Sequence, residues 1–517
     1  MAYQSTCTSR WQQSSLSREI DMTFRHYPLP SILKTVIFCG IMSFLVMGSG
    51  IPTAWAEASK GMRKPNFIII FTDDQGYQDL GCFGSPSIRT PNIDRMANEG
   101  IRFTHFYAQT VCGPSRAALM TGCYPLRVAK KANNQKEIHP SLHTQEITIA
   151  EILKDRGYKT ACYGKWDLAG HRQKGYDRNL LPTKQGFDYF FGTPTSNDSV
   201  TNLLRNETLI EPKSDMSKLT KRYTDEALEF IRKNRDNEFF IYLAHTMPHL
   251  RLAASENFKG KSRRGLYGDV IEEIDFNVGR LLNTVRELGL EKVTYIIFTS
   301  DNGPWFLDRH PALSKQKDQG GSHGGDSAPL RGHKTSTWEG GVRVPCVMWA
   351  PGRIPEGLVS AELTTTMDIL PTLAHLSGGN IPRDRIIDGK NITDLMHGKT
   401  GAKSETDAFY YYGHTQLMAV RSDKWKLHLP RSINTMERWN VFHRESDIVD
   451  FLKPHLYNLE DDPGEQNNLA ETYPDTVKEL IILADRARND IGDYNRLGQN
   501  ARFFDPQPRR TDIRDEW

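Results

Sequence analysis

Residues 66–72 read NFIIIFT, and this almost unbroken apolar run, followed at once by Asp73-Asp74-Gln75-Gly76, decides the fold. A strand without a polar face has to be covered on both sides, which is typical of the parallel sheets of α/β proteins. Similar runs recur at 159–163, 239–244, 295–300 and 345–350, and amphipathic helical patterns lie between them at 92–98, 148–155, 219–234, 268–288 and 367–376. The sequence therefore predicts an α/β fold with a large, mixed but mostly parallel sheet sandwiched by helices.

The pattern changes after about Asp388. Short runs at 410–412, 417–420, 425–429 and 455–459 are typical of antiparallel strands, and 476–488 is typical of a helix packed on them. We therefore expect an N-terminal extension with a signal peptide at 1–56, a main domain at 62–388 and a smaller C-terminal α+β subdomain at 389–517. The polar loop 308–327 is long enough to shape a pocket mouth, where His310, Lys317 and His323 would contact a substrate or remain solvated.

Composition excludes several classes of protein. Lysine plus arginine number 66 against 63 aspartate plus glutamate, a formal net charge of +3, which argues against a basic nucleic-acid-binding face. Hydrophobic residues make up 38% of the chain and aromatic residues 10%, which argues against disorder. The cysteines, 7 in all, include no C-x-x-C pair, so neither a disulfide framework nor structural zinc is indicated.

The N-terminus has the pattern of a secretory signal peptide. A short apolar run at 36–46 follows basic residues and precedes Ala54-Trp55-Ala56, so cleavage is expected after Ala56. A membrane anchor would need about 20 apolar residues, more than this run offers. We therefore expect export to the periplasm or the medium, with no stable membrane span in the mature chain. Sequons at Asn197, Asn206 and Asn391 predict glycans only in a host that makes them.

Two of the apolar runs end in acidic turns. Asp73 and Asp74 follow the first, and Asp301-Asn302-Gly303 follows the run at 295–300. One such pair alone is ordinarily turn or helix-cap chemistry. Two pairs at the carboxyl ends of strands in one parallel sheet favour a site for a hard divalent cation, which prefers converging carboxylate and amide oxygens.

A cysteine precedes a predicted helix in the stretch 110–122. Pro114 suits the first helical turn, so Cys112 would lie just ahead of the helix N-terminus, where free amides and the helix dipole favour an anion. Arg116 would add a positively charged fork. In the alternative interpretation Cys112 is a small core residue and Arg116 a surface charge.

Taken together, these motifs resemble those of a known family. Cys112-Gly113-Pro114-Ser115-Arg116, followed by Thr121-Gly122, is similar to the signature of the type I sulfatases of the alkaline phosphatase superfamily. Other matching motifs follow in order between 65 and 468: Asp73-Asp74, Gly164-Lys165-Trp166, Pro248-His249, Asp301-Asn302-Gly303, 329–334, 339–345 and 456–459. Several motifs in order are more specific than any one. The resemblance implies a formylglycine-dependent, arylsulfatase-like hydrolase acting on aryl sulfates or sulfated saccharides.

The resemblance also implies roles for individual residues. Cys112 would be oxidised to Cα-formylglycine by a formylglycine-generating maturation enzyme and would bind Ca²⁺ with the strand-end residues Asp73, Asp74, Asp301 and Asn302. Four basic residues would surround the sulfate: Arg116, Lys165, His249 and Lys334. A hydroxyl of the hydrated aldehyde would attack sulfur, and its second hydroxyl would later expel sulfate. His249 is the first candidate for the general acid and Lys334 the second.

One position departs from the family pattern. The family usually has Gly-Lys-Trp-His, whereas here Asp167 follows Gly164-Lys165-Trp166. A carboxylate can still accept the proton whose removal triggers sulfate release, although it brings negative charge near an anionic substrate. Three interpretations stay open, in this order: Asp167 acts directly, His171 supplies the missing imidazole, or Asp167 is structural.

Two other functions compete with a sulfatase. The first is a phosphonate monoester hydrolase or phosphodiesterase of the same superfamily. The second is a catalytically silent, secreted carbohydrate-binding protein, which only Asp167 supports.

Overall fold

The computed structural model describes residues 63–128, 142–170, 176–197, 201–305, 324–413, 415–431, 451–493 and 496–502, all within one compact unit from Arg63 to Trp517. The predicted signal peptide lies outside the described residues, as do His171, His310, Lys317 and His323.

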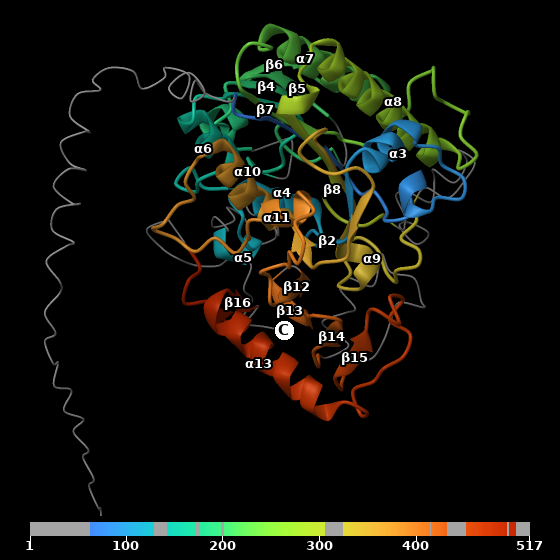
Figure 1. Ribbon diagram of the computed structural model, residues 1–517, viewed down its shortest axis with the longest axis vertical. Helices are drawn as coiled ribbons and strands as arrows, with labels where there is room; N and C mark the ends of the chain where they lie inside the picture. The colour runs from blue at the N-terminus through green and yellow to red at the C-terminus, as the bar shows by residue number, and fades with distance from the viewer. Residues whose placement is uncertain are drawn as a thin grey trace, which may run out of the picture. The chain divides into compact units, whose positions relative to one another are not determined.

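A mixed sheet of 11 strands forms the centre of this unit (Figure 1). Its order is β10-β2-β9-β8-β1-β7-β3-β4-β5-β6, with β11 paired to β2. The bounds are β1 (Asn66–Thr72), β2 (Ile101–Tyr107), β3 (Lys159–Lys165), β4 (Tyr189–Thr193), β5 (Leu203–Arg205), β6 (Thr208–Glu211), β7 (Phe239–Ala244), β8 (Thr294–Ser300), β9 (Arg343–Trp349), β10 (Leu358–Ser360) and β11 (Thr364–Thr365). Strands β8, β1, β7, β3 and β4 run parallel, whereas β9, β5 and β6 are antiparallel to their neighbours. The predicted mixed, mostly parallel sheet is confirmed.

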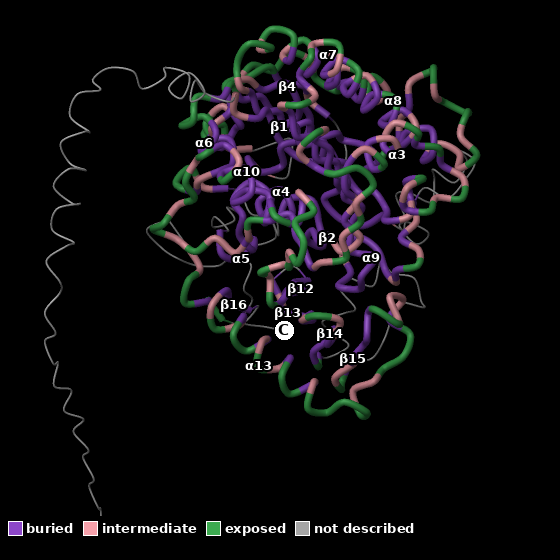
Figure 2. Tube along the Cα trace, viewed as in Figure 1, coloured by how far each residue is buried: buried purple, intermediate pink, exposed green. Residues whose placement is uncertain are grey.

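Helices cover both faces of the sheet because β1 is apolar on both sides. Phe67, Ile69 and Phe71 pack in one buried cluster with α4 (Cys112–Thr121), α6 (Ile149–Asp155) and α10 (Ile369–Ser377). Ile68 and Ile70 pack in another with α3 (Pro91–Asn98), α7 (Leu219–Lys233) and α8 (Leu266–Glu287). Figure 2 shows burial along the central strands and exposed residues on the outer sides of the covering helices. Within the described ranges, no helix is both long and apolar enough to cross a bilayer.

The remaining short elements connect these layers. They are α5 (Pro125–Val128), α9 (Glu339–Val342), α11 (Thr393–Met396), η1 (Gly81–Phe83), η2 (Arg178–Leu180), η3 (Pro182–Lys184), η4 (Met216–Lys218), η5 (Glu291–Val293) and η7 (Thr366–Asp368). The cysteines of the described part, Cys82, Cys112, Cys123, Cys162 and Cys346, are all free.

The C-terminal part forms a second, antiparallel sheet in the order β12-β13-β14-β15. Its strands are β12 (Phe409–Gly413), β13 (Gln416–Ser422), β14 (Trp425–His428) and β15 (His455–Asn458); α13 (Pro474–Asp490) and the pair β16 (Gly492–Asp493) and β17 (Arg496–Leu497) follow. The apolar face of α13 shares a buried cluster with this sheet and with Tyr107, Ala118 and Val342 of the main part. The predicted C-terminal α+β subdomain is confirmed, whereas its boundary near residue 388 stays a prediction.

Gly164 permits β3 to approach β7 closely next to Lys165. Its φ is +96°, and a Cβ there would lie 1.7 Å from the carbonyl oxygen of Ala244. We expect Gly164→Ala to lower the free energy of unfolding by about 3 kcal/mol or more, through strain and steric overlap. Gly157 is a matched control, since its φ is +89° but a Cβ there would meet nothing within 4 Å. Gly157→Ala should cost about 1 kcal/mol. Denaturant unfolding measures both variants, and an equal loss in the free energy of unfolding for Gly164→Ala and Gly157→Ala would contradict the close approach of β3 to β7.

Candidate active site

The two acidic turns lie side by side because β1 and β8 are neighbouring parallel strands whose last residues, Thr72 and Ser300, are paired. The backbone N–H of Asp74 donates to Asp301 Oδ1 at 3.0 Å, and Asn302 Nδ2 donates to Asp74 Oδ1 at 2.7 Å. Asp74 has a φ of 69°, a conformation that aspartate tolerates better than most residues. The structure thus brings both predicted acidic turns into one buried group.

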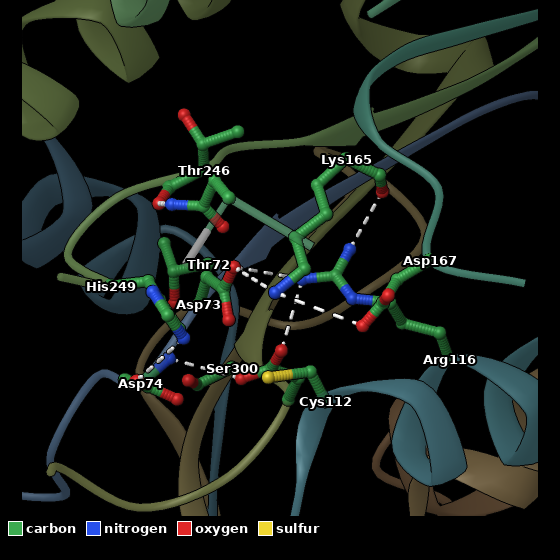
Figure 3. A network of polar contacts seen from close by, with 12 residues as sticks. Thr72, Asp73, Asp74, Cys112, Arg116, Lys165, Asp167, Thr246, His249 and Ser300 are labelled. Carbon is green, nitrogen blue, oxygen red and sulfur yellow. Dashed lines mark hydrogen bonds and ion pairs between the residues drawn. The ribbon is translucent and has the colours of Figure 1, made fainter. Parts of the chain in front are cut away.

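Cys112 faces these turns from the start of α4 (Figure 3). It is the first residue of the helix rather than the one before it, and its side chain is buried. Lys334 Nζ lies 3.3 Å from Cys112 Sγ and donates to Asp74 Oδ2 at 2.9 Å. Burial and the negative charge of Asp73 raise the pKa of the Cys112 thiol well above its usual value. An unmodified Cys112 is therefore a neutral thiol at ordinary pH and a weak nucleophile.

Arg116 and Lys165 supply buried positive charge on the other side of the acids. Arg116 donates to Asp301 Oδ2 at 2.9 Å and to the carbonyl of Lys165 at 2.8 Å, and both of its salt-bridge partners are buried. Lys165 Nζ donates to Asp73 Oδ2 at 2.8 Å. The interpretation of Arg116 as a surface charge is wrong, since the residue is fully buried.

The surrounding charges shift the pKa values of Asp73 and Asp301 in opposite directions. Burial alone would raise the pKa of Asp73, but Lys165, His249, Arg116 and Lys334 hold it well below its usual range. Burial and the neighbouring negative charge of Asp73 raise the pKa of Asp301 well above its usual value. The cluster therefore has more carboxylate than its own cations neutralise, and a further cation would let Asp301 ionise.

The donor set fits an oxygen-liganded cation. Among the residues that the structure describes, four carboxylates, Asp73, Asp74, Asp167 and Asp301, are buried with three permanent cations, Arg116, Lys165 and Lys334. Within the described ranges, Asp73 Oδ1 and Asn302 Oδ1 are buried acceptors without a hydrogen-bond partner. Oxygen ligands of this kind suit Ca²⁺ better than zinc.

Among the His, Cys, Asp and Glu side chains of the described residues, the group that could hold a metal ion differs from the predicted set. Ligand atoms of Asp73, Asp74, Cys112 and His249 lie within 4.8 Å of one another. Asp301, whose two oxygens accept hydrogen bonds from the Asp74 amide and from Arg116, is not in this group. His249 was predicted near the sulfate and not at the metal.

His249 is held by its backbone neighbour. Its Nδ1 lies 2.6 Å from the carbonyl oxygen of Leu250, which can only accept, so Nδ1 carries a proton and Nε2 faces Asp74 Oδ2 at 3.6 Å. Burial and the positive charge of Lys334 lower the pKa of His249. Nε2 is thus the ring atom directed at the acidic cluster.

Asp167 joins the same cluster. Its side chain is buried, and its Oδ2 lies 3.8 Å from Lys165 Nζ. Its φ is 55°, in the left-handed region that Asp, Asn and His adopt more readily than most residues. Position 167 can therefore carry the family's histidine without added backbone strain.

Sequence reasoning missed two residues of the site. The ring of Trp305 lies under Lys334 Nζ at 4.3 Å from its centroid and 5.3 Å from the ring of His249. The hydroxyl of Tyr242 accepts a hydrogen bond from Arg116 at 3.3 Å. Trp305 could have been suspected from its place directly after the Asp301–Pro304 turn, whereas Tyr242 lies within an apolar strand and gives no such signal.

One predicted glycosylation site is buried. Asn197 is 3% exposed, and its Nδ2 donates to the carbonyl of Thr246 at 3.1 Å, so a glycan there is incompatible with this arrangement. Asn206 and Asn391 are exposed.

Comparisons with known proteins place the chain among the sulfatases. A model of the sulfatase family matches residues 65–379, and a model of the C-terminal region of aryl-sulfatase matches residues 404–507. N-acetylgalactosamine-6-sulfatase of Canis lupus familiaris is 36% identical over 452 residues, covering 79% of this chain and 82% of its own. Steryl-sulfatase of Homo sapiens is 31% identical over 525 residues, covering 84% and 89%. A solved structure described under glycosaminoglycan metabolism by Bacteroides thetaiotaomicron has a TM-score of 0.72 and 27% identity, covering 83% of this chain and 100% of that one.

Proposed function

Because the chain belongs to the sulfatase family and is a sulfuric ester hydrolase, we propose that it releases inorganic sulfate from sulfated saccharides or aryl sulfates, with Cys112 oxidised to formylglycine and Ca²⁺ at the acidic turns. The observation that carries the proposal is the convergence of Cys112, Lys334 and Asp74 at the edge of the sheet. A saccharide substrate is supported by the name of one relative, an N-acetylgalactosamine-6-sulfatase, whereas another relative is named a steryl-sulfatase.

The two groups that the family implies would supply the reacting hydroxyls and positive charge. Oxidation of Cys112 to formylglycine would provide one hydroxyl of the hydrated aldehyde to attack sulfur and a second to expel sulfate. Asp73, Asp74, Asp301 and Asn302 would hold Ca²⁺, a Lewis acid that favours ionisation of a bound hydroxyl. The neutral thiol of an unmodified cysteine offers neither hydroxyl.

The basic residues would bind and stabilise the sulfate group. Arg116, Lys165 and Lys334 are buried and already fixed by hydrogen bonds to carboxylates. Preorganised cations of this kind meet the charge that grows on the sulfuryl oxygens in the transition state without a reorganisation cost.

In-line attack assigns different tasks to Lys334 and His249. It requires the leaving oxygen to lie on the side of sulfur opposite to position 112. Lys334 Nζ, 3.3 Å from Cys112 Sγ, is therefore better placed to hold the attacking side chain and a sulfuryl oxygen than to protonate the leaving alcohol. We assign that protonation to Nε2 of His249, whose pKa the negative charge of a bound ester would raise again.

Asp167 is proposed to accept the proton whose loss releases sulfate. We expect Asp167→His to keep or increase kcat, because either side chain can accept a proton and both tolerate the left-handed backbone. Asp167→Asn keeps the shape but is no base, so its kcat should fall roughly 10²- to 10⁴-fold. Steady-state hydrolysis of one sulfate ester by the three proteins is the measurement. A large loss in Asp167→His would instead mean that the pocket is built around the carboxylate.

The experiment that tests the function compares two substrates. Hydrolysis of p-nitrophenyl sulfate is expected to exceed that of a p-nitrophenyl phosphate diester in kcat/KM. A clear preference for the diester would favour the phosphonate monoester hydrolase or phosphodiesterase. No turnover of either, together with an unmodified Cys112, would favour the silent carbohydrate-binding protein.

Export is a further part of the proposal. A signal peptide cleaved near Ala56 would deliver the chain to the periplasm or the medium, where sulfated saccharides are accessible. N-terminal sequencing of the secreted protein is the direct measurement.

A further inference from the structure

A buried cluster of charges lies between the main sheet and the C-terminal sheet. We call Glu339, Lys426, His428 and Glu465 the Glu339 cluster. Lys426 Nζ lies 3.0 Å from Glu339 Oε1 and 2.9 Å from Glu465 Oε1, and His428 Nε2 lies 2.8 Å from Glu465 Oε1. All four side chains are fully buried. Buried charges are costly unless each is paired, so this geometry is strictly constrained.

Further groups keep Glu339 ionised. The hydroxyls of Tyr107 and Tyr411 donate to its carboxylate at 2.5 and 2.8 Å, and Arg343 Nη1 lies 3.7 Å from Glu339 Oε2. Burial opposes ionisation, but Lys426, Arg421 and Arg343 hold the pKa of Glu339 well below its usual range. Glu339 therefore ties together residues of β2, β9, β12 and β14.

The segment that carries Lys334 is attached to this cluster. In the segment 327–341, which we call the Lys334 loop, the backbone N–H of Glu339 donates to Glu465 Oε2 at 2.7 Å, and Arg331 Nη1 donates to the Glu465 carbonyl at 3.1 Å. The Arg331 guanidinium stacks on Trp338 at 3.9 Å, and the Trp338 ring centroid lies 4.4 Å from that of His428. One side of the Lys334 loop thus rests on β14 and on the turn after β15.

The other side of the same loop faces the active site. The N–H of Lys334 donates to the Pro304 carbonyl, and the N–H of Thr335 donates to the Thr110 carbonyl, two residues before Cys112. Thr110 Oγ1 in turn donates to the Tyr412 carbonyl of β12 at 3.1 Å. The C-terminal sheet therefore contacts both the loop that carries Lys334 and the segment that leads into Cys112.

We propose that Lys426 and Glu465 are positioning residues of the active site, which hold Lys334 against position 112 through Glu339 and the Lys334 loop. The inference rests on the proposed function, in which Lys334 contacts the reacting groups. Displacement of a reacting or charge-stabilising group by about 1 Å is enough to lower the rate roughly 10²-fold. The C-terminal subdomain is then a part of the catalytic apparatus as well as of the fold.

The first test is independent of activity. Lys426→Met combined with Glu465→Gln removes the formal charges of both partners, while Glu339 keeps its contacts with Tyr107, Tyr411 and Arg343. We expect faster amide hydrogen exchange in the peptide covering 327–341, including the Lys334, Gly340 and Gly341 amides that are bonded in the native loop. Unchanged exchange in this peptide would overturn the proposal.

A matched control weakens another contact to the C-terminal part. Arg127 of α5 pairs with Asp490 of α13 at 2.7 Å, and neither residue contacts the Lys334 loop in the described interactions. Asp490→Asn should raise exchange near α13 but leave that of 327–341 and kcat unchanged. Equal loosening of 327–341 in this control would overturn a specific role for the Glu339 cluster.

The second test is a double-mutant cycle with Lys334→Ala. We expect the Lys426→Met/Glu465→Gln variant to lose roughly ten- to a hundredfold in kcat, with little further loss when Lys334 is already alanine. If the kcat losses of the two variants multiply independently, Lys426 and Glu465 do not act through Lys334, and the proposal is overturned. If the charge-balanced variant does not fold, Arg331→Ala, which removes only the contacts of that side chain, enters both tests in its place.

The two proposals fail in different ways. Wild-type protein without turnover of sulfate or phosphate esters would reject the proposed function, while the exchange experiment would still decide whether the Glu339 cluster holds the Lys334 loop. If the protein prefers the phosphate diester, the cycle is measured on that substrate.

Discussion

Replacement of Cys112 by alanine is expected to lower kcat/KM for a sulfate ester by roughly 10⁴-fold or more, because no other side chain of the site offers the reacting hydroxyls. The folded state should change little, since the native thiol is neutral and small and accepts a hydrogen bond from Lys334 alone among the residues that the structure describes. Steady-state kinetics with p-nitrophenyl sulfate and thermal unfolding of the same preparations are the measurements. Cys346→Ala is the matched control, since this free cysteine on β9 is equally buried and packs in the apolar cluster that contains Phe67, Ile69 and Phe71.

The modification itself can be observed directly. Peptide mass spectrometry of the segment around Cys112, from protein made in its native host, is expected to show an aldehyde in place of the thiol. An active enzyme whose Cys112 is entirely unmodified would contradict the proposed nucleophile, whatever the result for the alanine variant.

Asp301→Asn is expected to produce the second largest loss. Removal of a ligand should weaken calcium binding by at least roughly 10- to 100-fold and reduce kcat/KM by about three orders of magnitude at low calcium. Both Asp301 oxygens accept hydrogen bonds, from the Asp74 amide and from Arg116. In asparagine an NH₂ group replaces one of these oxygens, so it would face a donor and one hydrogen bond would be lost. Stability should fall by about 3 kcal/mol, because a buried charge-assisted bond is broken.

The measurement is a calcium titration of activity after chelation, together with denaturant unfolding. Wild-type activity should disappear with the chelator and return with calcium. Asp275→Asn is the control: Asp275 is a buried aspartate that accepts hydrogen bonds from Asn92 and Ile93, away from the site. It should cost stability but leave the calcium requirement unchanged. Wild-type-like turnover by Asp301→Asn at low calcium would refute the proposed metal site.

The strands with long apolar runs were the easiest to predict. β1 and β7 lie where the runs 66–72 and 239–244 predict them. β2 was missed because Arg102, Thr104 and His105 interrupt its apolar pattern. β6 and β10 were missed because they are short and largely exposed, and β5 and β11 because two or three residues carry too little pattern to identify.

The residues that meet at the edge of the sheet could be named from the sequence, but their contacts could not. The end of an apolar strand pointed to Asp73, the start of a helix to Cys112 and the family resemblance to Lys334, and the neighbouring parallel strands explain why the acidic turns meet. The Tyr242–Arg116 bond and the Glu339 cluster depend on strand order and on packing between distant segments, which local pattern does not encode. The burial of Asn197 could not be predicted for the same reason.

The burial of Cys112 and the pairing of β1 with β8 together limit the time in which Cys112 is accessible during synthesis of the chain. The cysteine is 2% exposed, and the ribosome makes β8, which carries the second acidic turn, more than 200 residues after β1, which carries the first. At 5–20 residues per second, translation leaves an interval on the order of tens of seconds in which the nascent segment is still open to another enzyme. Any oxidation of this thiol by another enzyme must therefore occur before the sheet folds. Slower pairing of β8 with β1 would increase the fraction of chains in which Cys112 is oxidised.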